Sequence, residues 1–226
     1  MYRLYNRPGS GGFVVEAALT LAGARFELQE FDSKPGTSLP ESFRDTNPWV
    51  QVPTLVLPEG GTMTETAAIL IHLAASFPGK GLGPEPGTAQ HAVFLRWMVF
   101  ASVNLYEAVL RRGYPFRYTT DTDGYEGLRA AADMRMADAL AVLETAVAPG
   151  PFLLGGEMCV ADIYITMLCT WFAGEIDAPY LAALTQGVEQ HPSIAPIWRR
   201  HFGDRRHPLP SCVASSAAGC SAGCGR

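Results

Sequence analysis

The sequence predicts an α/β domain with a mixed four-stranded sheet, followed by an all-α helical bundle. Strand-like and helix-like segments alternate over residues 1–76, whereas only helical patterns follow over 88–203. Between them, residues 77–87 hold four glycines and three prolines, a composition that neither a helix nor a central strand tolerates. We therefore predict two domains, at 1–76 and 88–203, joined by a linker at 77–87.

The first strand and helix carry the clearest local signals. Residues 2–7 alternate between apolar and polar side chains and run into the Gly-rich turn at 8–12. Apolar residues then recur with helical spacing from Phe13 to Leu21, and Gly23 is a typical helix end. The beginning of the chain thus predicts a strand, a tight turn and a helix.

The rest of the first domain is predicted from composition and turns. A second strand is expected over 25–31, and the polar, Pro-containing segment 33–48 is expected to be mainly a loop. Residues 52–57 and 62–64 form two further strand patterns around a Glu-Gly-Gly turn, and residues 65–75 are helical in pattern.

The second domain is predicted to contain helices throughout, with Thr88 as the N-cap of the first. Helices are expected at 89–111, 125–147, 160–172, 180–190 and 193–201. Residues 204–226 are dominated by small and polar side chains, cannot bury enough apolar surface to fold, and are expected to be a disordered tail.

Charge and hydropathy exclude several functions. The chain has 17 Lys+Arg against 22 Asp+Glu, which disfavours nucleic acid as a partner. The longest apolar stretch, 92–110, is interrupted by Arg96, Asn104 and Glu107, so no membrane span or membrane partner is expected. Without a recognisable signal peptide, a cytoplasmic location is expected.

Cysteine and histidine give no metal-binding pattern. Five cysteines cannot all pair with one another. Cys159 and Cys169 lie in apolar segments and are expected to be reduced and buried, whereas Cys212, Cys220 and Cys224 lie in the tail. The four histidines weighed as ligands show no ligand spacing and are interpreted as surface or half-buried residues: His72, His91, His191 and His201. We predict no metal.

Three motifs, in this order, resemble the cytosolic glutathione S-transferase family. They are YNRPGS at 5–10, NPWVQVPTL at 47–55 and TETAAI at 64–69. The resemblance covers residues 1 to about 203 and implies a thioredoxin-like first domain, a helical second domain and a homodimer. It also implies glutathione as co-substrate, without a further cofactor.

The first motif most resembles the serine-using branch (theta- or delta-like, and bacterial relatives). Ser10 would then be catalytic, holding the glutathione sulfur as thiolate at the start of a helix, where free N–H groups favour negative charge. A free thiol has a pKa of about 8.5, so it needs such stabilisation. The main-chain amides of Gly11 and Gly12 are the alternative donors.

Other branches of the family fit this turn less well. The position of the tyrosine in the tyrosine-using branch is Asn6 here, and Tyr5 points to the other face of its strand. No cysteine lies near Gly11, which argues against glutaredoxin-like disulfide chemistry.

The second and third motifs imply the remainder of the glutathione site. The resemblance implies a cis peptide bond between Val52 and Pro53, whose neighbouring main chain would pair with the cysteinyl part of glutathione. Glu65 and Thr66 would hold the ammonium and carboxylate of the γ-glutamyl group. Gln51 would hold the glycine end, where relatives often place a basic residue.

Gln51 carries no positive charge, so Lys34 and Arg44 are the alternative candidates for contacting the glycine end of glutathione.

The second substrate is expected to be a small apolar electrophile. Its pocket is predicted to include Phe13, Tyr106, Tyr114 and Phe116, of which Tyr114 and Phe116 are favoured because they lie in the loop at 113–118 and loops often carry binding sites. The predicted function is thiolate attack on this electrophile by a detoxifying glutathione S-transferase. The alternative is a non-catalytic member of the family that serves as a protein-interaction module.

Overall fold

In the computed structural model of the protein, residues 1–32 and 38–203 are described. Lys34, the predicted tail and its three cysteines lie outside the described residues.

The first part of the chain forms the predicted mixed four-stranded sheet, in the order β2-β1-β3-β4. Its strands are β1 (Tyr2–Asn6), β2 (Phe26–Glu30), β3 (Thr54–Val56) and β4 (Thr62–Met63). β1 and β2 are parallel, whereas β3 is antiparallel to both β1 and β4. β3 is shorter than the predicted 52–57, because Pro53 has no N–H to donate to a sheet.

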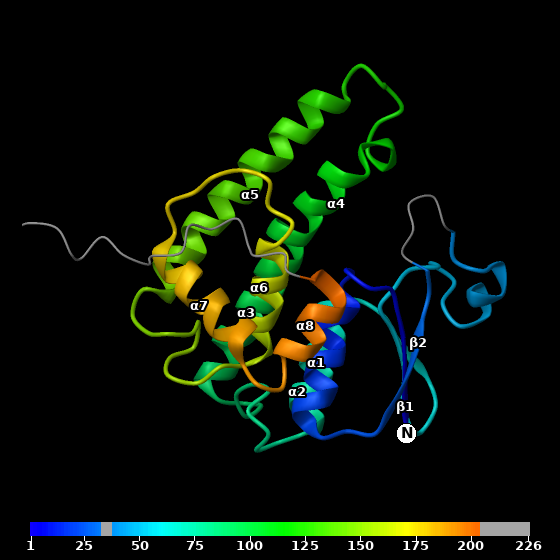
Figure 1. Ribbon diagram of the computed structural model, residues 1–226, viewed down its shortest axis with the longest axis vertical. Coiled ribbons are helices and arrows are strands. Elements are labelled where there is room, and N and C mark those ends of the chain that lie inside the picture. Colours follow the sequence, from blue (N-terminus) through cyan, green and yellow to red (C-terminus); the bar gives the residue numbers. More distant parts are fainter. Residues whose placement is uncertain (33–37, 204–226) are drawn as a thin grey trace, which may run out of the picture.

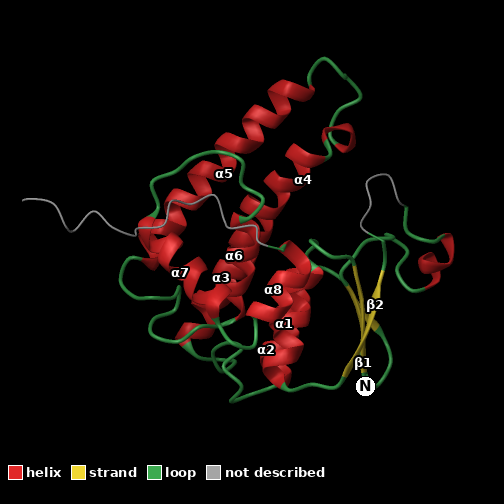
Figure 2. Ribbon diagram, viewed as in Figure 1, coloured by secondary structure: helices red, strands yellow, loops and turns green. Residues whose placement is uncertain are grey.

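Two helices of this domain lie on one side of the sheet (Figures 1 and 2). α1 (Gly12–Ala22) is the crossover that a parallel strand pair requires, and α2 (Thr66–Ser76) packs against it. A 3₁₀ helix, η1 (Glu41–Asp45), lies in the long segment before β3. Both α1 and α2 begin close to the residues of the predicted glutathione site.

The second part of the chain is helical, as predicted. Its helices are α3 (Ala89–Phe100), α4 (Glu107–Gly113), α5 (Tyr125–Val147), α6 (Val160–Cys169), α7 (Pro179–Gln190) and α8 (Ala195–Phe202). The Thr88 hydroxyl accepts a hydrogen bond from His91 N–H at 3.1 Å, which confirms the predicted N-cap. Between α5 and α4, a 3₁₀ turn η3 (Pro115–Arg117) begins the connection at the tip of the projecting hairpin in Figure 1.

The predicted helix at 89–111 runs on to Gly113 but contains a π-helical segment, η2 (Ala101–Tyr106). Within it, the Asn104 side chain donates to the main-chain oxygen of Phe100 at 3.0 Å. Such π-turns are frequent at functional sites. Here the segment ends at Tyr106, one of the predicted pocket residues.

Helix α6 forms the centre of the second domain, and all of its residues are buried. Its Asp162 accepts hydrogen bonds from the main-chain N–H groups of Cys159 and Leu153, each at 2.8 Å. Cys159 and Cys169 are buried free thiols, as predicted. The predicted linker contributes Leu82, which is 1% exposed and accepts from Val160 N–H at 3.0 Å.

The continuous helix over Ala89–Gly113 is long and apolar enough to cross a membrane by length and composition, with mean hydropathy 1.4 in its most apolar window. A helix in the core of a globular protein meets the same criterion, and this one packs against α2, α5 and α6. The absence of a membrane span stays a prediction.

Helix α8 brings the end of the described chain back to its beginning. It packs against α1, as Figure 1 shows, and Phe13 of α1 makes edge-on ring contacts with Trp198 and Phe202 of α8 at 5.3 and 5.1 Å. Residues near position 200 therefore lie beside the turn that precedes α1.

Candidate active site

The turn between β1 and α1 is organised by Ser10 and Asn6. The Ser10 hydroxyl donates to Asn6 Oδ1 at 3.0 Å and accepts from Gly12 N–H at 3.3 Å. Asn6 is fully buried, and Ser10 is partly exposed. The Ser10 proton is therefore committed to Asn6, and the side chain would have to turn to donate to a ligand.

Positions 11 and 12, which follow Ser10, require glycine because neighbouring atoms occupy the space that a Cβ would need. A Cβ on Gly11 would lie 2.6 Å from the Tyr106 hydroxyl, 2.7 Å from Thr66 Oγ1 and 3.3 Å from Pro53 Cδ. A Cβ on Gly12 would lie 1.8 Å from Asn6 Oδ1. The start of α1, the start of α2, Pro53 and Tyr106 thus converge at Gly11.

The loop before β3 is held by Asn47. Its side-chain nitrogen donates to the main-chain oxygen of Gln51 at 2.9 Å and to Thr54 Oγ1 at 3.0 Å. The Val52–Pro53 peptide bond is cis, as the resemblance implies. The Gln51 side chain is exposed, so it is free to contact a ligand at this edge.

The residue that precedes helix α2 is strained. Glu65 has φ 66°, a left-handed conformation that typically costs about 1–3 kcal/mol in a residue other than glycine. Its side chain is exposed, whereas the following Thr66 is 4% exposed. The exposed carboxylate and the free amides of the helix start therefore lie next to each other.

Tyr106 carries a buried hydroxyl at the same place. Burial raises the pKa of Tyr106 to about 12, although hydrogen bonds from Thr66 and the Gly11 N–H act in the opposite direction. The phenol is therefore neutral at physiological pH and keeps a proton that it can donate.

The other aromatic residues divide into three groups. Trp171 is tilted against Tyr106, with ring centroids 5.6 Å apart. Tyr114 and Phe116 are 43% and 61% exposed and make edge-on contact at 6.0 Å. Phe13 is fully buried between α1 and α8, so the expectation that it lines the electrophile pocket is wrong.

Sequence reasoning also missed Trp171 and misplaced His201. Trp171 was included in a buried helix predicted over 160–172, but α6 ends at Cys169 and leaves Trp171 partly exposed. The His201 side chain is 0% exposed rather than at the surface, and it contacts the Ser10 turn. Neither placement has a local pattern that would predict it.

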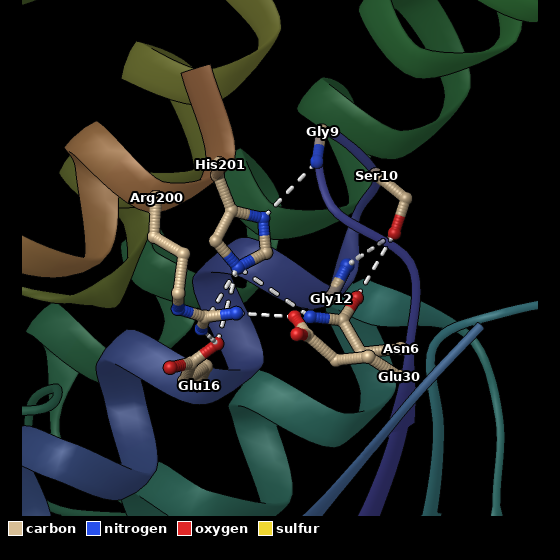
Figure 3. A network of polar contacts seen from close by, with 8 residues as sticks. All are labelled: Asn6, Gly9, Ser10, Gly12, Glu16, Glu30, Arg200 and His201. Atoms are coloured by element: carbon tan, nitrogen blue, oxygen red, sulfur yellow. Dashed lines mark hydrogen bonds and ion pairs between the residues drawn. The ribbon is translucent and has the colours of Figure 1, made fainter. Parts of the chain in front are cut away.

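A charged network lies behind this turn (Figure 3). Arg200 forms ion pairs with both Glu16 and Glu30, and His201 Nε2 lies 3.1 Å from Glu16 Oε2. Burial alone would raise the pKa of Glu16, but hydrogen bonds from His201 and Arg200 and the charge of Arg200 outweigh it, so the pKa is lowered. The Arg200 guanidinium supplies the positive charge between the two carboxylates.

Comparisons with known proteins identify the class. A sequence model described as "Glutathione S-transferase, N-terminal domain" matches residues 14–76. An uncharacterized GST-like protein of Escherichia coli K12, YncG, is 28% identical over 208 residues, covering 89% of this chain and 98% of that protein.

Two solved structures agree over both domains. A glutathione transferase homologue from Sulfitobacter with bound glutathione superposes with a TM-score of 0.78 at 25% identity, covering 87% of this chain and 96% of that one. A sphingomonad glutathione S-transferase in complex with glutathione gives 0.74 at 29% identity, covering 87% and 97%.

The fold is therefore a thioredoxin-like domain followed by a helical bundle, the architecture shared by these transferases. Residues 14–76 thus match the N-terminal domain family of glutathione S-transferases, and the chain is similar to glutathione transferases over both domains.

Proposed function

We propose that this protein is a glutathione transferase that holds the glutathione sulfur as a thiolate at the start of α1 for attack on a small apolar electrophile. One observation carries the proposal: the starts of α1 and α2, Pro53 and the Tyr106 hydroxyl converge within 3.3 Å of a Cβ position on Gly11. Two helix starts that face one point favour an anionic ligand there. The glutathione-bound relatives support glutathione as that ligand.

Each part of glutathione has a proposed partner. Glu65 and Thr66 hold the γ-glutamyl group, the Val52 main chain beside Pro53 pairs with the cysteinyl part, and Gln51 contacts the glycine end. Ser10, after rotating away from Asn6, or the amides of Gly11 and Gly12 stabilise the thiolate. Each charge-assisted hydrogen bond is worth about 1.5–3 kcal/mol, and lowering a thiol pKa by one unit takes about 1.4 kcal/mol.

The electrophile is proposed to lie against Tyr106 and Trp171, with Tyr114 and Phe116 at its outer edge. The Tyr114 side chain lies close enough to Tyr106 to raise its pKa, which supports placing them in one pocket. Binding both reactants side by side replaces a bimolecular encounter by a pre-oriented reaction. No cofactor beyond the co-substrate glutathione is proposed.

We also propose a cytoplasmic, detoxifying homodimer. Val99 and Val103 lie one turn apart on the α3–η2 helix and are 56% and 58% exposed, and Trp49 of the first domain is 75% exposed. Exposed apolar residues of this size favour a protein interface. Sedimentation at micromolar concentration should give twice the chain mass of 24.3 kDa, and a single species of 24.3 kDa would contradict the dimer.

A non-catalytic interaction module is the second candidate. The commitment of the Ser10 proton to Asn6 favours it, since a ligand thiol would have to compete for that donor. A catalytic role predicts that Ser10→Ala retains binding and loses rate.

The deciding experiment is retention on glutathione-agarose together with conjugation of a chloro-nitro-arene. Wild type, Ser10→Ala and the exposed control Ser193→Ala are compared. Wild type should bind and conjugate, Ser10→Ala should lose rate, and Ser193→Ala should match wild type. If wild type neither binds nor conjugates glutathione, the proposed transferase activity is contradicted. If Ser10→Ala conjugates at the full rate, the Gly11 and Gly12 amides rather than Ser10 stabilise the thiolate.

A further inference from the structure

His201 belongs to the last described helix, yet it contacts the turn that precedes the first. Its Nδ1 lies 3.2 Å from the main-chain nitrogen of Gly9. A main-chain N–H can only donate, so Nδ1 accepts this hydrogen bond and carries no proton. Figure 3 shows the ring between Gly9 on one side and Glu16 on the other.

The opposite ring nitrogen completes the assignment of the tautomer. In a neutral imidazole with Nδ1 unprotonated, the proton is on Nε2, which faces Glu16 Oε2 at 3.1 Å. Glu16 in turn pairs with Arg200, which also pairs with Glu30 of β2. Asn6 accepts from Ser10 through Oδ1, and its Nδ2, which is itself a donor, lies 3.5 Å from Nε2.

We propose that His201 is a positioning residue for the glutathione site: its neutral ring fixes the turn at 8–12 through Gly9, and protonation of Nδ1 releases that turn. This inference rests on the proposed function for its effect on the reaction, although the contact with Gly9 can be measured without it. His201 does not touch the reacting atoms and acts through the main chain of the turn.

The charges around the ring define the pH dependence. The groups that face His201 are Glu16 of α1, Arg200 of α8, Glu30 of β2 through Arg200, and the neutral Asn6 of β1. A second proton on the ring would place Nδ1–H against Gly9 N–H, two donors facing each other. A ring that carried this proton could therefore no longer accept from Gly9, and the turn would lose this hydrogen bond.

Two substitutions distinguish the role of Nδ1 from that of Nε2. In His201→Asn, the amide oxygen takes the place of Nδ1 and can accept from Gly9. In His201→Gln, the amide takes the place of Nε2 and can donate to Glu16 but leaves Gly9 N–H without its acceptor. Both remove a buried ring that contacts Phe13 at 5.4 Å between ring centroids, so each serves as a packing control for the other.

The first measurement is hydrogen exchange of the Gly9 amide, with histidine nitrogen shifts from NMR. The Gly9 amide should be protected from exchange in wild type and in His201→Asn. In His201→Gln its exchange rate should rise about tenfold, the typical effect of one lost hydrogen bond. Equal protection in wild type and His201→Gln, or a wild-type ring protonated on Nδ1, overturns the proposal.

The second measurement is conjugation rate against pH, with thiolate absorbance of bound glutathione. His201→Gln should lower kcat about tenfold with little change in KM for glutathione, whereas His201→Asn, which keeps an acceptor for Gly9, should keep most of kcat. Equal losses of kcat in the two variants, with equal pH profiles, reduce His201 to a packing residue and overturn the proposal.

His191 provides the matched control. Its Nδ1 accepts from the N–H of Ser193 at 3.3 Å, so His191→Gln removes the same kind of bond in the connection between α7 and α8. Rate and pH profile should be unchanged. If wild type neither binds nor conjugates glutathione, the proposed function and the reaction role of His201 both fail, and Gly9 exchange alone decides whether His201 fixes the turn.

Discussion

Asn6 Oδ1 lies 1.8 Å from the point at which a Cβ on Gly12 would be placed. The buried amide of β1 therefore fills the space beside the first residue of α1, and it also accepts the Ser10 hydroxyl. The close approach of strand and helix at this point depends on glycine, because any side chain would push the two elements apart.

Gly12→Ala is expected to destabilise the protein by about 1–3 kcal/mol, the usual cost of overpacking a core. The melting temperature and the urea midpoint measure this. Gly127→Ala is the control: it lies in α5, nothing approaches its Cβ position within 4 Å, and alanine should stabilise that helix by about 0.5–1 kcal/mol. Equal effects of the two substitutions would contradict the packing argument.

Gly11→Ala is expected to impair glutathione binding more than folding. The added methyl group must displace the hydroxyls of Tyr106 and Thr66, which lie 2.6 and 2.7 Å from it. Tyr106→Phe removes one of these oxygens, so the double variant should recover part of the lost affinity. Calorimetric titration with glutathione gives the coupling between the two positions, and strictly additive losses would show that they act separately.

Glu65→Gln is expected to weaken glutathione binding about tenfold, because a charged partner of the ligand ammonium becomes neutral. Its exposed side chain contributes little to folding, so the melting temperature should not change. Glu59→Gln, at another exposed acid, is the control. An unchanged dissociation constant removes Glu65 from the proposed site.

The pH dependence of stability should contain a contribution from Glu16. Its pKa in the folded protein is lower than its ordinary value of 4.5, so the unfolded chain binds the proton more readily. The stabilisation is therefore complete above about pH 4.5 and is lost as pH falls through the folded pKa. Glu16→Gln should flatten this part of the curve of unfolding free energy against pH; an identical slope contradicts it.

Cys159→Ser is expected to stabilise α6 by about 1 kcal/mol. Cys159 is the N-cap of this helix, and a hydroxyl accepts the hydrogen bond of the third helical residue better than a thiol does. Cys169→Ser is the matched control, because its buried thiol has no capping position and a hydroxyl there should destabilise. Chemical unfolding distinguishes the two; destabilisation by both contradicts the capping argument.

The sequence predicts those features that depend on local pattern. The helix over 125–147 and the cap at Thr88 follow from neighbouring residues, and the structure confirms them. The cis bond before Pro53 follows from a motif and is also confirmed.

Contacts between distant segments could not be predicted in this way. Phe13 was expected in a pocket, but α8 covers it, and His201 has no neighbour in sequence that predicts its contact with Gly9. The π-segment that ends at Tyr106 also lacks a local pattern, because the apolar spacing of 89–111 is that of an ordinary helix.

The hydrogen bond between Gly9 and His201 spans 192 positions of the chain. During synthesis, the residues around Ser10 leave the ribosome early, but this support cannot form until helix α8 has followed. Contacts between residues so far apart in sequence are slow to form, because the chain loses the entropy of closing the intervening loop before the contact contributes any stabilisation. The turn at 8–12 is thus expected to reach its final rigidity among the last steps of folding, so that an incomplete chain would not present the proposed thiolate site fully formed.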